Sequence, residues 1–295
     1  MTDPFLKGIL LRAASRFVCG EEMPEALEAA KKANGLGHAA TIDYMGESTR
    51  DEALAERATE EFVRVAKEIK TRGLDSSISL DLSHVGMALD ADFAFENASK
   101  IARAAREAGT EVMVSMEGTE RTDEILSLHE RLSESFEEVG ITLQAYLHRT
   151  ESDLAAALER PGRIRLVKGA FEEPESAALP RDSTDLDEAY RRHMETLLAS
   201  GHTLSIATHD ETILDHAHEF IRENGLEASN AEFEMLYGIT PERLEAMRER
   251  GCRTRVYLVY GEEWYLYLCH RLAEHPPNIY RAVASLGSLR DLTPS

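Results

Sequence analysis

The chain has 295 residues, of which 43% are hydrophobic and 29% are charged, an ordinary composition for one large or two average folded domains. Its 33 Lys and Arg residues against 54 Asp and Glu residues leave a formal charge of −21 at pH 7, which repels nucleic acids and anionic membrane surfaces. The three cysteines form no CxxC pattern, and no apolar run approaches the roughly 18 residues of a membrane span. We therefore expect a cytoplasmic protein with no disulfide framework and no integral membrane segment.

Hydrophobic periodicity and Gly or Pro punctuation predict a regular alternation of strands and helices after two N-terminal helices within residues 1–36. The predicted strands are residues 38–45, 77–82, 111–116, 141–147, 164–170, 202–208, 231–236 and 253–259. The predicted helices are residues 24–34, 49–72, 92–108, 122–139, 150–159, 186–200, 211–224, 241–250, 262–274 and 278–289. We interpret Gly73, Gly109 and Gly140 as residues that end the preceding helices.

Eight strands, each followed by a helix, predict a single (βα)8 TIM barrel over residues 37–295. An open doubly wound sheet is the alternative, but no GxGxxG follows the first strand and no Walker motif occurs. In a barrel of this kind, ligands bind at the carboxyl ends of the strands. Each predicted strand end carries a polar or aromatic residue, which indicates a functional site there.

The predicted strand at 164–170, IRLVKGA, places Arg165 and Lys168 on either side of an apolar pair and then turns at Gly169. Two cations and a glycine at a strand end favour a nearby anionic or phosphate-bearing cofactor, because a bare backbone allows close approach. An ordinary strand that ends in a turn with solvated cations is the alternative.

The sequence resembles the proline dehydrogenase family in five segments that follow in order: LQAYLHRTESDL, RLVKGAFEEPE, ATHDETIL, FEMLYGI and VYLVYGEEWYLYLCHRLAEHPPN. MGE at 45–47 and ISLDLSHVGMAL resemble the first two strands of that family, so the resemblance runs from about residue 14 to about residue 280. It implies a distorted barrel with non-covalent FAD, oxidation of L-proline, and an electron acceptor such as a quinone or oxygen. The resemblance does not decide whether the protein forms a homo-oligomer.

The resemblance also implies roles for individual residues. The implied cofactor-binding residues are Gln144, Arg165, Val167, Lys168, Gly169, Ala170, Thr208, His209 and Asp210. The implied substrate residues are Leu236, Tyr257 and Tyr267, which would surround the substrate ring, and Arg271, which would bind a carboxylate through its guanidinium fork. Glu47 and His270 would form an ion pair that gates the site.

Three implied substrate positions depart from the family pattern. Asp81 stands where the family has Lys, Ser115 where it has Asp, and His270 where it has the first Arg of an Arg-Arg pair. A smaller departure is Glu234, where Gln is usual. Counted with Arg271, the formal charge of the substrate positions falls from about +2 to about zero, or about +1 with a protonated histidine. A related amine with a displaced carboxylate, no carboxylate or an added cationic nitrogen is therefore favoured over L-proline.

Three functions remain as hypotheses. The first is a flavoenzyme that transfers hydride from the carbon beside an amine nitrogen to FAD, with proline or a related amine as its substrate. The second keeps FAD but oxidises a hydrazine or another specialised-metabolite amine. The third is a non-catalytic flavin- or metabolite-binding protein, which the retained Tyr257, Tyr267 and Arg271 argue against. No metal site is expected, since the candidate histidines lie on separate elements without an acidic partner pattern.

Overall fold

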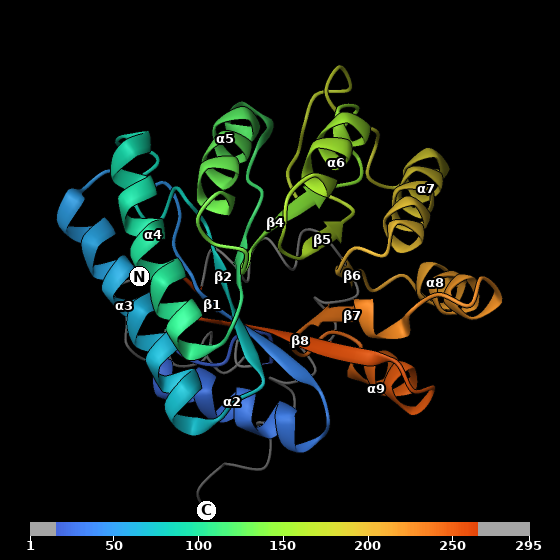
Figure 1. Ribbon diagram of the computed structural model, residues 1–295, viewed down its shortest axis with the longest axis horizontal. Helices are drawn as coiled ribbons and strands as arrows, with labels where there is room; N and C mark the ends of the chain where they lie inside the picture. The colour runs from blue at the N-terminus through green and yellow to red at the C-terminus, as the bar shows by residue number, and fades with distance from the viewer. Residues whose placement is uncertain (1–15, 265–295) are drawn as a thin grey trace, which may run out of the picture.

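The protein forms a closed barrel of eight parallel strands in chain order, and β8 pairs with β1 (Figure 1). A computed structural model describes residues 16–264. The strands are β1 Ala39–Tyr44, β2 Ser76–Leu80, β3 Val112–Val114, β4 Val139–Gln144, β5 Ile164–Val167, β6 Leu204–Ala207, β7 Ala231–Leu236 and β8 Arg253–Tyr260. This architecture confirms the predicted (βα)8 barrel.

The helices surround the strands, as Figure 1 shows. They are α2 Met23–Gly35, α3 Glu52–Arg72, α4 Ala91–Ala108, α5 Thr122–Ser133, α6 Thr150–Leu158, α7 Thr184–Ser200, α8 Glu211–Glu223 and α9 Pro241–Glu249, with short 3-10 turns η1 Thr119–Arg121 and η2 Ala228–Asn230. α2 contacts β1 and β8. The division into residues 1–36 and a barrel over 37–295 stays a prediction, and the helices predicted at 262–274 and 278–289 extend outside the described residues.

Capping residues explain where the long helices begin and end. Asp51 accepts a hydrogen bond from the backbone of Leu54 at 3.0 Å at the start of α3, and Asp90 caps α4 in the same way. Gly73 and Gly109 end these helices in the left-handed region, at φ 61° and 70°, where a side chain would be strained. Both glycines thus act as the sequence predicts.

Gly140 does not end a helix, and this prediction is wrong. α5 ends at Ser133, and Gly140 is the second residue of β4. A Cβ atom at this position would lie 2.3 Å from the carbonyl oxygen of Arg163, which precedes the neighbouring β5. Glycine is needed here because two strand backbones approach closely, a contact that the local sequence cannot reveal.

Alternate strand residues divide the barrel into an apolar outer layer and a polar interior. The side chains packed beneath the helices include Ile42, Ile78, Leu80, Leu166, Ile206 and Phe233. The intervening positions carry charged or hydroxyl side chains that contact one another across the barrel, among them Thr41, Ser77, Arg165, Glu234 and Arg255. TIM barrels usually fill this space with branched apolar side chains. Here the interior is a polar column, in which buried Arg and Glu side chains form ion pairs and contact hydroxyl groups.

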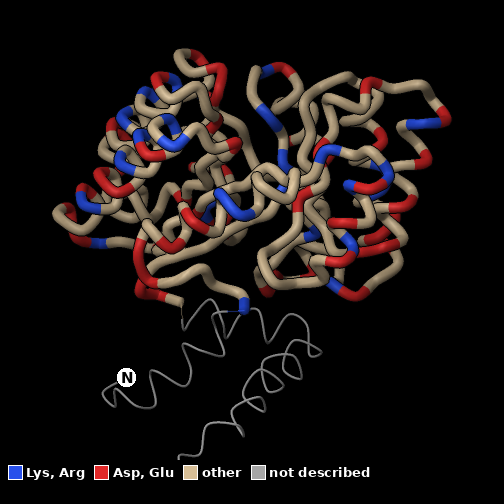
Figure 2. The backbone as a smooth tube through the Cα atoms, turned by 90° about the horizontal axis from the view of Figure 1, so that it is seen from below, with Lys and Arg blue, Asp and Glu red and all other residues tan. Residues whose placement is uncertain are grey.

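The outer surface carries the excess of negative charge. Figure 2 shows acidic positions distributed over the outer helices and loops, with basic positions between them. Within residues 16–264, no helix combines the length and the apolar character needed to cross a membrane.

Replacing Gly140 by alanine should destabilise the protein by roughly 1–3 kcal/mol, because the new methyl group must displace the backbone of the adjacent strand. Gly35→Ala is the matched control, since nothing lies within 4 Å of a Cβ atom there and Gly35 ends a helix. We expect this control to leave the free energy of unfolding unchanged or to raise it by up to about 1 kcal/mol. Urea denaturation measures both effects, and equal losses would contradict the strand-contact explanation.

Candidate active site

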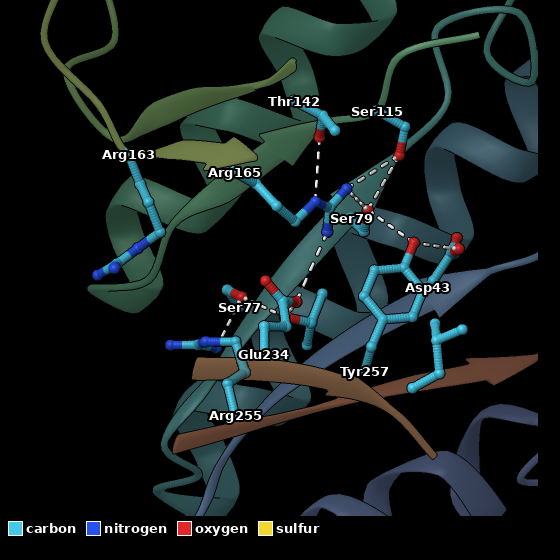
Figure 3. A network of polar contacts seen from close by, with 12 residues as sticks. Asp43, Ser77, Ser79, Ser115, Thr142, Arg163, Arg165, Glu234, Arg255 and Tyr257 are labelled. Carbon is cyan, nitrogen blue, oxygen red and sulfur yellow. Dashed lines mark hydrogen bonds and ion pairs between the residues drawn. The ribbon is translucent and has the colours of Figure 1, made fainter. Parts of the chain in front are cut away.

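The carboxyl ends of the strands bring together polar side chains from five parts of the sheet. Asp43 belongs to β1, Ser79 to β2, Arg165 to β5 and Tyr257 to β8, while Ser115 directly follows β3. Figure 3 shows these groups in one network. The cluster lies at the end of the barrel where this fold binds its ligands.

Arg165 is at the centre of the network, with a buried side chain that donates hydrogen bonds from Nε and Nη2. The residue is 4% exposed. Its Nε donates to Thr142 Oγ1 at 3.0 Å, and its Nη2 donates to Ser79 Oγ at 3.1 Å and to Ser115 Oγ at 3.4 Å. Three hydroxyl groups from three positions in the sheet therefore hold one guanidinium in place (Figure 3).

Glu234 supplies a negative charge to this guanidinium. Its Oε1 lies 3.6 Å from Arg165 Nη1 and accepts a hydrogen bond from Thr41 Oγ1 at 2.8 Å. Glu234 is 3% exposed, so little water screens the pair. A buried guanidinium without such a partner would be strongly unfavourable.

Tyr257 connects Arg165 to the carboxyl groups. Its hydroxyl donates to Asp43 Oδ2 at 2.6 Å and lies 3.0 Å from Ser79 Oγ. The guanidinium carbon of Arg165 lies 5.0 Å from the centroid of the Tyr257 ring, within the range of a cation–π contact. Burial, together with the nearby charge of Asp43, raises the pKa of Tyr257 well above its usual range, so the phenol stays protonated.

Asp43 and Asp81 form an acidic pair at this end of the barrel. Burial raises the pKa of Asp43 to about 6, although the Tyr257 hydrogen bond and the Arg165 charge act in the opposite direction. Burial also raises the pKa of Asp81 well above its usual range, and the charges of Asp43 and Glu117 raise it further. A hydrogen bond with Ser115 only partly offsets these effects on Asp81. The pair therefore favours binding a proton or a cation.

Glu117 was not among the predicted site residues, yet it is buried beside the acidic pair. It accepts a hydrogen bond from the backbone of Ser83 at 3.1 Å and forms an ion pair with Arg121. Arg121 Nη2 also donates to Ser48 Oγ at 2.9 Å, next to the exposed Glu47. The charge of Glu47 acts on Arg121. The predicted pairing of Glu47 with His270 falls on a residue outside the described range and stays a prediction.

The predicted cofactor residues lie along the ends of β4, β5 and β6. Gln144 is buried, and its Nε2 donates to the carbonyl oxygen of Glu117 at 3.0 Å. Gly169 has φ 132°, and a Cβ atom there would lie 2.4 Å from the ring of Tyr146. Val167 is half-buried at the end of its strand. Ala170 is exposed, and its carbonyl oxygen accepts from Arg181 at 2.9 Å.

Lys168, for which the sequence predicts either an anionic cofactor or solvent as its surroundings, is bound by two carboxylates. Its Nζ donates to Asp187 at 2.6 Å and to Asp210 at 2.8 Å. Burial acts to raise the pKa of Asp210, but hydrogen bonds from Lys168 and Thr212 lower it to about 2. Asp210 also caps α8 by accepting from the backbone of Thr212 and Ile213. These contacts give Asp210 a structural role beside any role toward a cofactor.

His209, Thr208 and Leu236 lie together where β6 and β7 end. Nε2 of His209 accepts from the backbone of Leu236 at 3.3 Å, and Oγ1 of Thr208 accepts from the backbone of Asp210 at 3.2 Å. Tyr267, His270 and Arg271 lie outside the described residues. Within residues 16–264, no three His, Cys, Asp or Glu side chains are grouped as metal ligands would be.

The sequence interpretation gave no individual role to four residues of the network, namely Asp43, Ser79, Glu117 and Thr142, although Asp43 and Glu117 fall at or next to predicted strand ends. A signal for them was present, because polar residues two positions apart in a strand share one face. Thr41 and Asp43, or Ser77 and Ser79, could thus have been assigned to the interior.

A cavity of about 280 Å³ lies at the opposite end of the barrel. It is lined by Lys70 near the end of α3 and by residues at or near the strand entrances, including Arg163, Arg253 and Arg255. In TIM barrels this end serves stability rather than catalysis, so we assign the site to the carboxyl ends of the strands.

Fold and site together define a barrel protein of the enzyme class that carries its reactive groups at the carboxyl ends of the strands. A family model described as proline dehydrogenase matches residues 26–278. Proline dehydrogenase 2 of Bacillus subtilis (strain 168) is 34% identical over 267 residues, which cover 90% of this chain and 88% of that protein. Proline dehydrogenase of Deinococcus radiodurans is 35% identical over 270 residues, covering 90% and 87%. The chain belongs to the proline dehydrogenase family, flavoprotein oxidoreductases that act on the CH–NH group of proline.

Solved structures agree with the fold. Proline utilization A of Bdellovibrio bacteriovorus, inactivated by N-propargylglycine, superposes with a TM-score of 0.85 at 21% identity, covering 91% of this chain and 33% of that chain. Proline utilization A of Bradyrhizobium japonicum gives a TM-score of 0.72 at 20% identity, covering 88% and 30%. The chain thus spans about a third of these longer proteins.

Asp43→Asn should remove a pH dependence of stability. The pKa of Asp43 is about 6 in the folded protein and about 3.9 in an unfolded chain. The unfolded chain therefore loses this proton first as the pH rises, and the Asp43 contribution to stability falls between about pH 4 and about pH 6. The free energy of unfolding of the unmodified protein minus that of the variant should decrease through this window and then level off.

Urea denaturation at a series of pH values measures this difference. Asp182→Asn, at an exposed position, is the control for the loss of one charge, and its difference should show no such decrease. A difference for Asp43→Asn that rises with pH or stays flat would contradict the assignment.

Proposed function

We propose that the protein is an FAD-dependent dehydrogenase that oxidises a C–N bond of a small amine, and that its substrate is a more cationic relative of proline rather than L-proline. The observation that carries the proposal is the buried guanidinium of Arg165, which contacts Ser79 and Ser115, with the acidic pair Asp43 and Asp81 at the same end of the barrel. A cytoplasmic location and a homo-oligomer remain predictions.

The chemistry of the described residues fits a flavin. Arg165 and Gln144 offer guanidinium and amide donors to the carbonyl and nitrogen edge of an isoalloxazine ring, and Thr208 and His209 add a hydroxyl and an imidazole. The chain turns at Gly169 without a side chain, which lets a ligand approach the backbone. Lys168 could contact a phosphate, but one of its two carboxylate partners would have to give way.

When bound, FAD would supply a hydride acceptor for the carbon beside the substrate nitrogen, and loss of that hydride together with the N–H proton would turn the C–N single bond into an imine. Arg165 would stabilise the negative charge that two electrons bring to the site. Asp81 would take up the proton that the amine nitrogen must lose, because burial and the charges of Asp43 and Glu117 raise its pKa and make it a stronger base than an ordinary carboxylate. Tyr257 would orient the substrate ring, with its hydroxyl held by Asp43. A quinone or oxygen would then reoxidise the cofactor.

The acidic pair is the reason to expect a cationic substrate. At 4 Å and an effective dielectric constant near 20, one unit charge of the wrong sign costs about 4 kcal/mol, a large penalty for a carboxylate ligand. Asp81 and Ser115 replace the lysine and aspartate that the family pattern implies, so the substrate carboxylate loses a cation. Hydrazines and specialised-metabolite amines satisfy the same charge preference and form the second candidate class.

We expect the purified protein to be yellow, with FAD bound non-covalently and released on denaturation. Arg165→Ala should weaken FAD binding about tenfold or more, equivalent to about 1.4 kcal/mol or more, because the central guanidinium is lost. Arg163→Ala is the control, since this side chain lies at the strand entrance and binds Glu111 at 2.9 Å. Visible spectra during FAD titration of the apoproteins measure both affinities. Colourless protein that cannot be reconstituted would contradict the proposal, and equal losses would contradict the role of Arg165.

The combined change Asp81→Lys, Ser115→Asp and His270→Arg should shift activity toward L-proline, because it restores the charges that the family pattern implies for a carboxylate substrate. The unmodified protein should bleach more readily with cationic amines than with L-proline under anaerobic conditions. The three single variants test whether the effects are non-additive, as expected if the three positions share one pocket, which the family resemblance implies. Oxidation of L-proline by the unmodified protein with a KM between about 1 μM and 1 mM and a kcat near 10 s⁻¹ would contradict the altered substrate.

A further inference from the structure

Strand β7 places two carboxylates inside the barrel. Glu232 and Glu234 are two residues apart and therefore point to the same side of the strand. They are 1% and 3% exposed. The two residues have the same chemistry and nearly the same burial, but they lie at different depths along the barrel.

Their partners differ. Glu232 contacts three guanidinium groups near the strand entrances, with Arg255 at 2.7 Å, Arg163 at 3.6 Å and Arg253 at 3.8 Å. Glu234, one layer closer to the site, lies against Arg165 at 3.6 Å (Figure 3). The charge of Glu234 also acts on Arg255.

Glu234 is not what holds Arg165 in position. The guanidinium is held by Thr142, Ser79 and Ser115, at distances between 3.0 and 3.4 Å. The 3.6 Å separation from Glu234 exceeds the normal range of a hydrogen bond, whereas the Coulomb interaction at this distance in a buried site remains large. Glu234 therefore contributes charge rather than geometry.

We propose that Glu234 balances the charge of Arg165 and thereby lowers the affinity of the site for reduced flavin relative to oxidised flavin. This inference rests on the proposed function, because it requires a flavin beside Arg165. Two electrons and a proton from the substrate leave the cofactor more negative, so an uncompensated guanidinium would hold the reduced form tightly. A carboxylate against that guanidinium weakens the preference, which favours transfer of the electrons to a quinone or oxygen.

Position 115 provides a second way to test whether Glu234 acts on Arg165 through its negative charge. Its Oγ lies 3.4 Å from Nη2 of Arg165, whereas Glu234 faces Nη1 of the same guanidinium. A carboxylate at position 115 would therefore supply a counter-charge from another side. If Glu234 acts through charge alone, moving the carboxylate from β7 to the end of β3 should preserve the balance.

The experiment measures the two-electron reduction potential of the FAD-bound protein by equilibration with a reference dye. Glu234→Gln keeps the size of the side chain and can still accept from Thr41, but it removes the charge. The ratio of affinities for reduced over oxidised flavin should rise about tenfold or more, an upward shift of about 30 mV or more for a two-electron couple.

Two matched variants separate charge from structure. Glu232→Gln makes the same chemical change on the same strand, at a carboxylate that pairs with Arg255, Arg163 and Arg253 instead of Arg165, and should alter the ratio less than threefold although it lowers thermal stability. The double variant Glu234→Gln with Ser115→Asp should return the ratio to within about threefold of that of the unmodified protein. A purely structural role for Glu234 would lower its stability without producing this pattern.

An unchanged potential in Glu234→Gln, an equal shift in Glu232→Gln, or failure of Ser115→Asp to restore the ratio would overturn the inference. A Glu234→Gln protein that does not fold would overturn it too, because the carboxylate would then serve the fold. An unmodified protein that binds no FAD would instead contradict the proposed function, so the two failures are distinguishable.

Discussion

The pairing of buried charges inside the barrel is the constraint on which the rest of the structure depends. Arg165 and Arg255 are almost completely removed from water, and Glu234 and Glu232 lie against them. Removing one partner of such a pair typically costs about 3–5 kcal/mol, because the other charge is left buried and unpaired. The strands that carry these residues therefore have little freedom in register. A slip of one residue would turn the charges toward the apolar layer beneath the helices.

The candidate active site is the upper layer of the same polar column. The alternation that directs Thr41 and Ser77 inward near the middle of the barrel directs Asp43 and Ser79 inward one layer higher. Arg165 connects the layers, since it contacts Ser79 toward the site and Glu234 toward the centre. Changes in the charged interior should for this reason affect the site electrostatically, even where the backbone does not move.

Sequence patterns predicted the barrel well where the signal was local. The glycines at 73 and 109 end helices because of their own backbone conformation, which a short window of sequence indicates. Gly140 follows a helical pattern equally well, but its role depends on the carbonyl of Arg163 in the next strand. A helix end requires glycine for its backbone conformation, whereas a close contact between strands requires glycine because there is no room for a side chain. Only the three-dimensional structure distinguishes these two roles.

The same limit applies to the site. Arg165 could be predicted because two cations and a glycine in one strand segment favour an anionic cofactor, and the family resemblance implied a cofactor-binding role for the same residue. The ion pairs of Lys168 could not be predicted, because its partners Asp187 and Asp210 are 19 and 42 residues away in the sequence. Asp43 falls near the end of a predicted strand but was given no role, because the local sequence does not show which face of the strand it occupies. Closure of the barrel turns that position inward.

The departures from the family pattern acquire a physical meaning around Arg165. The pattern implies an aspartate at position 115 and a glutamine at position 234, whereas this chain has Ser115 and Glu234. Both side chains lie within 3.6 Å of the Arg165 guanidinium. Relative to the implied pattern, the carboxylate beside this group thus shifts from position 115 at the end of β3 to position 234 in β7, deeper in the barrel. Relocation leaves the end of β3 with a neutral hydroxyl, beside a carboxyl at Asp81 whose pKa is raised. In this way the chain can keep the electrostatics of the proposed flavin site while the substrate side changes its preferred charge.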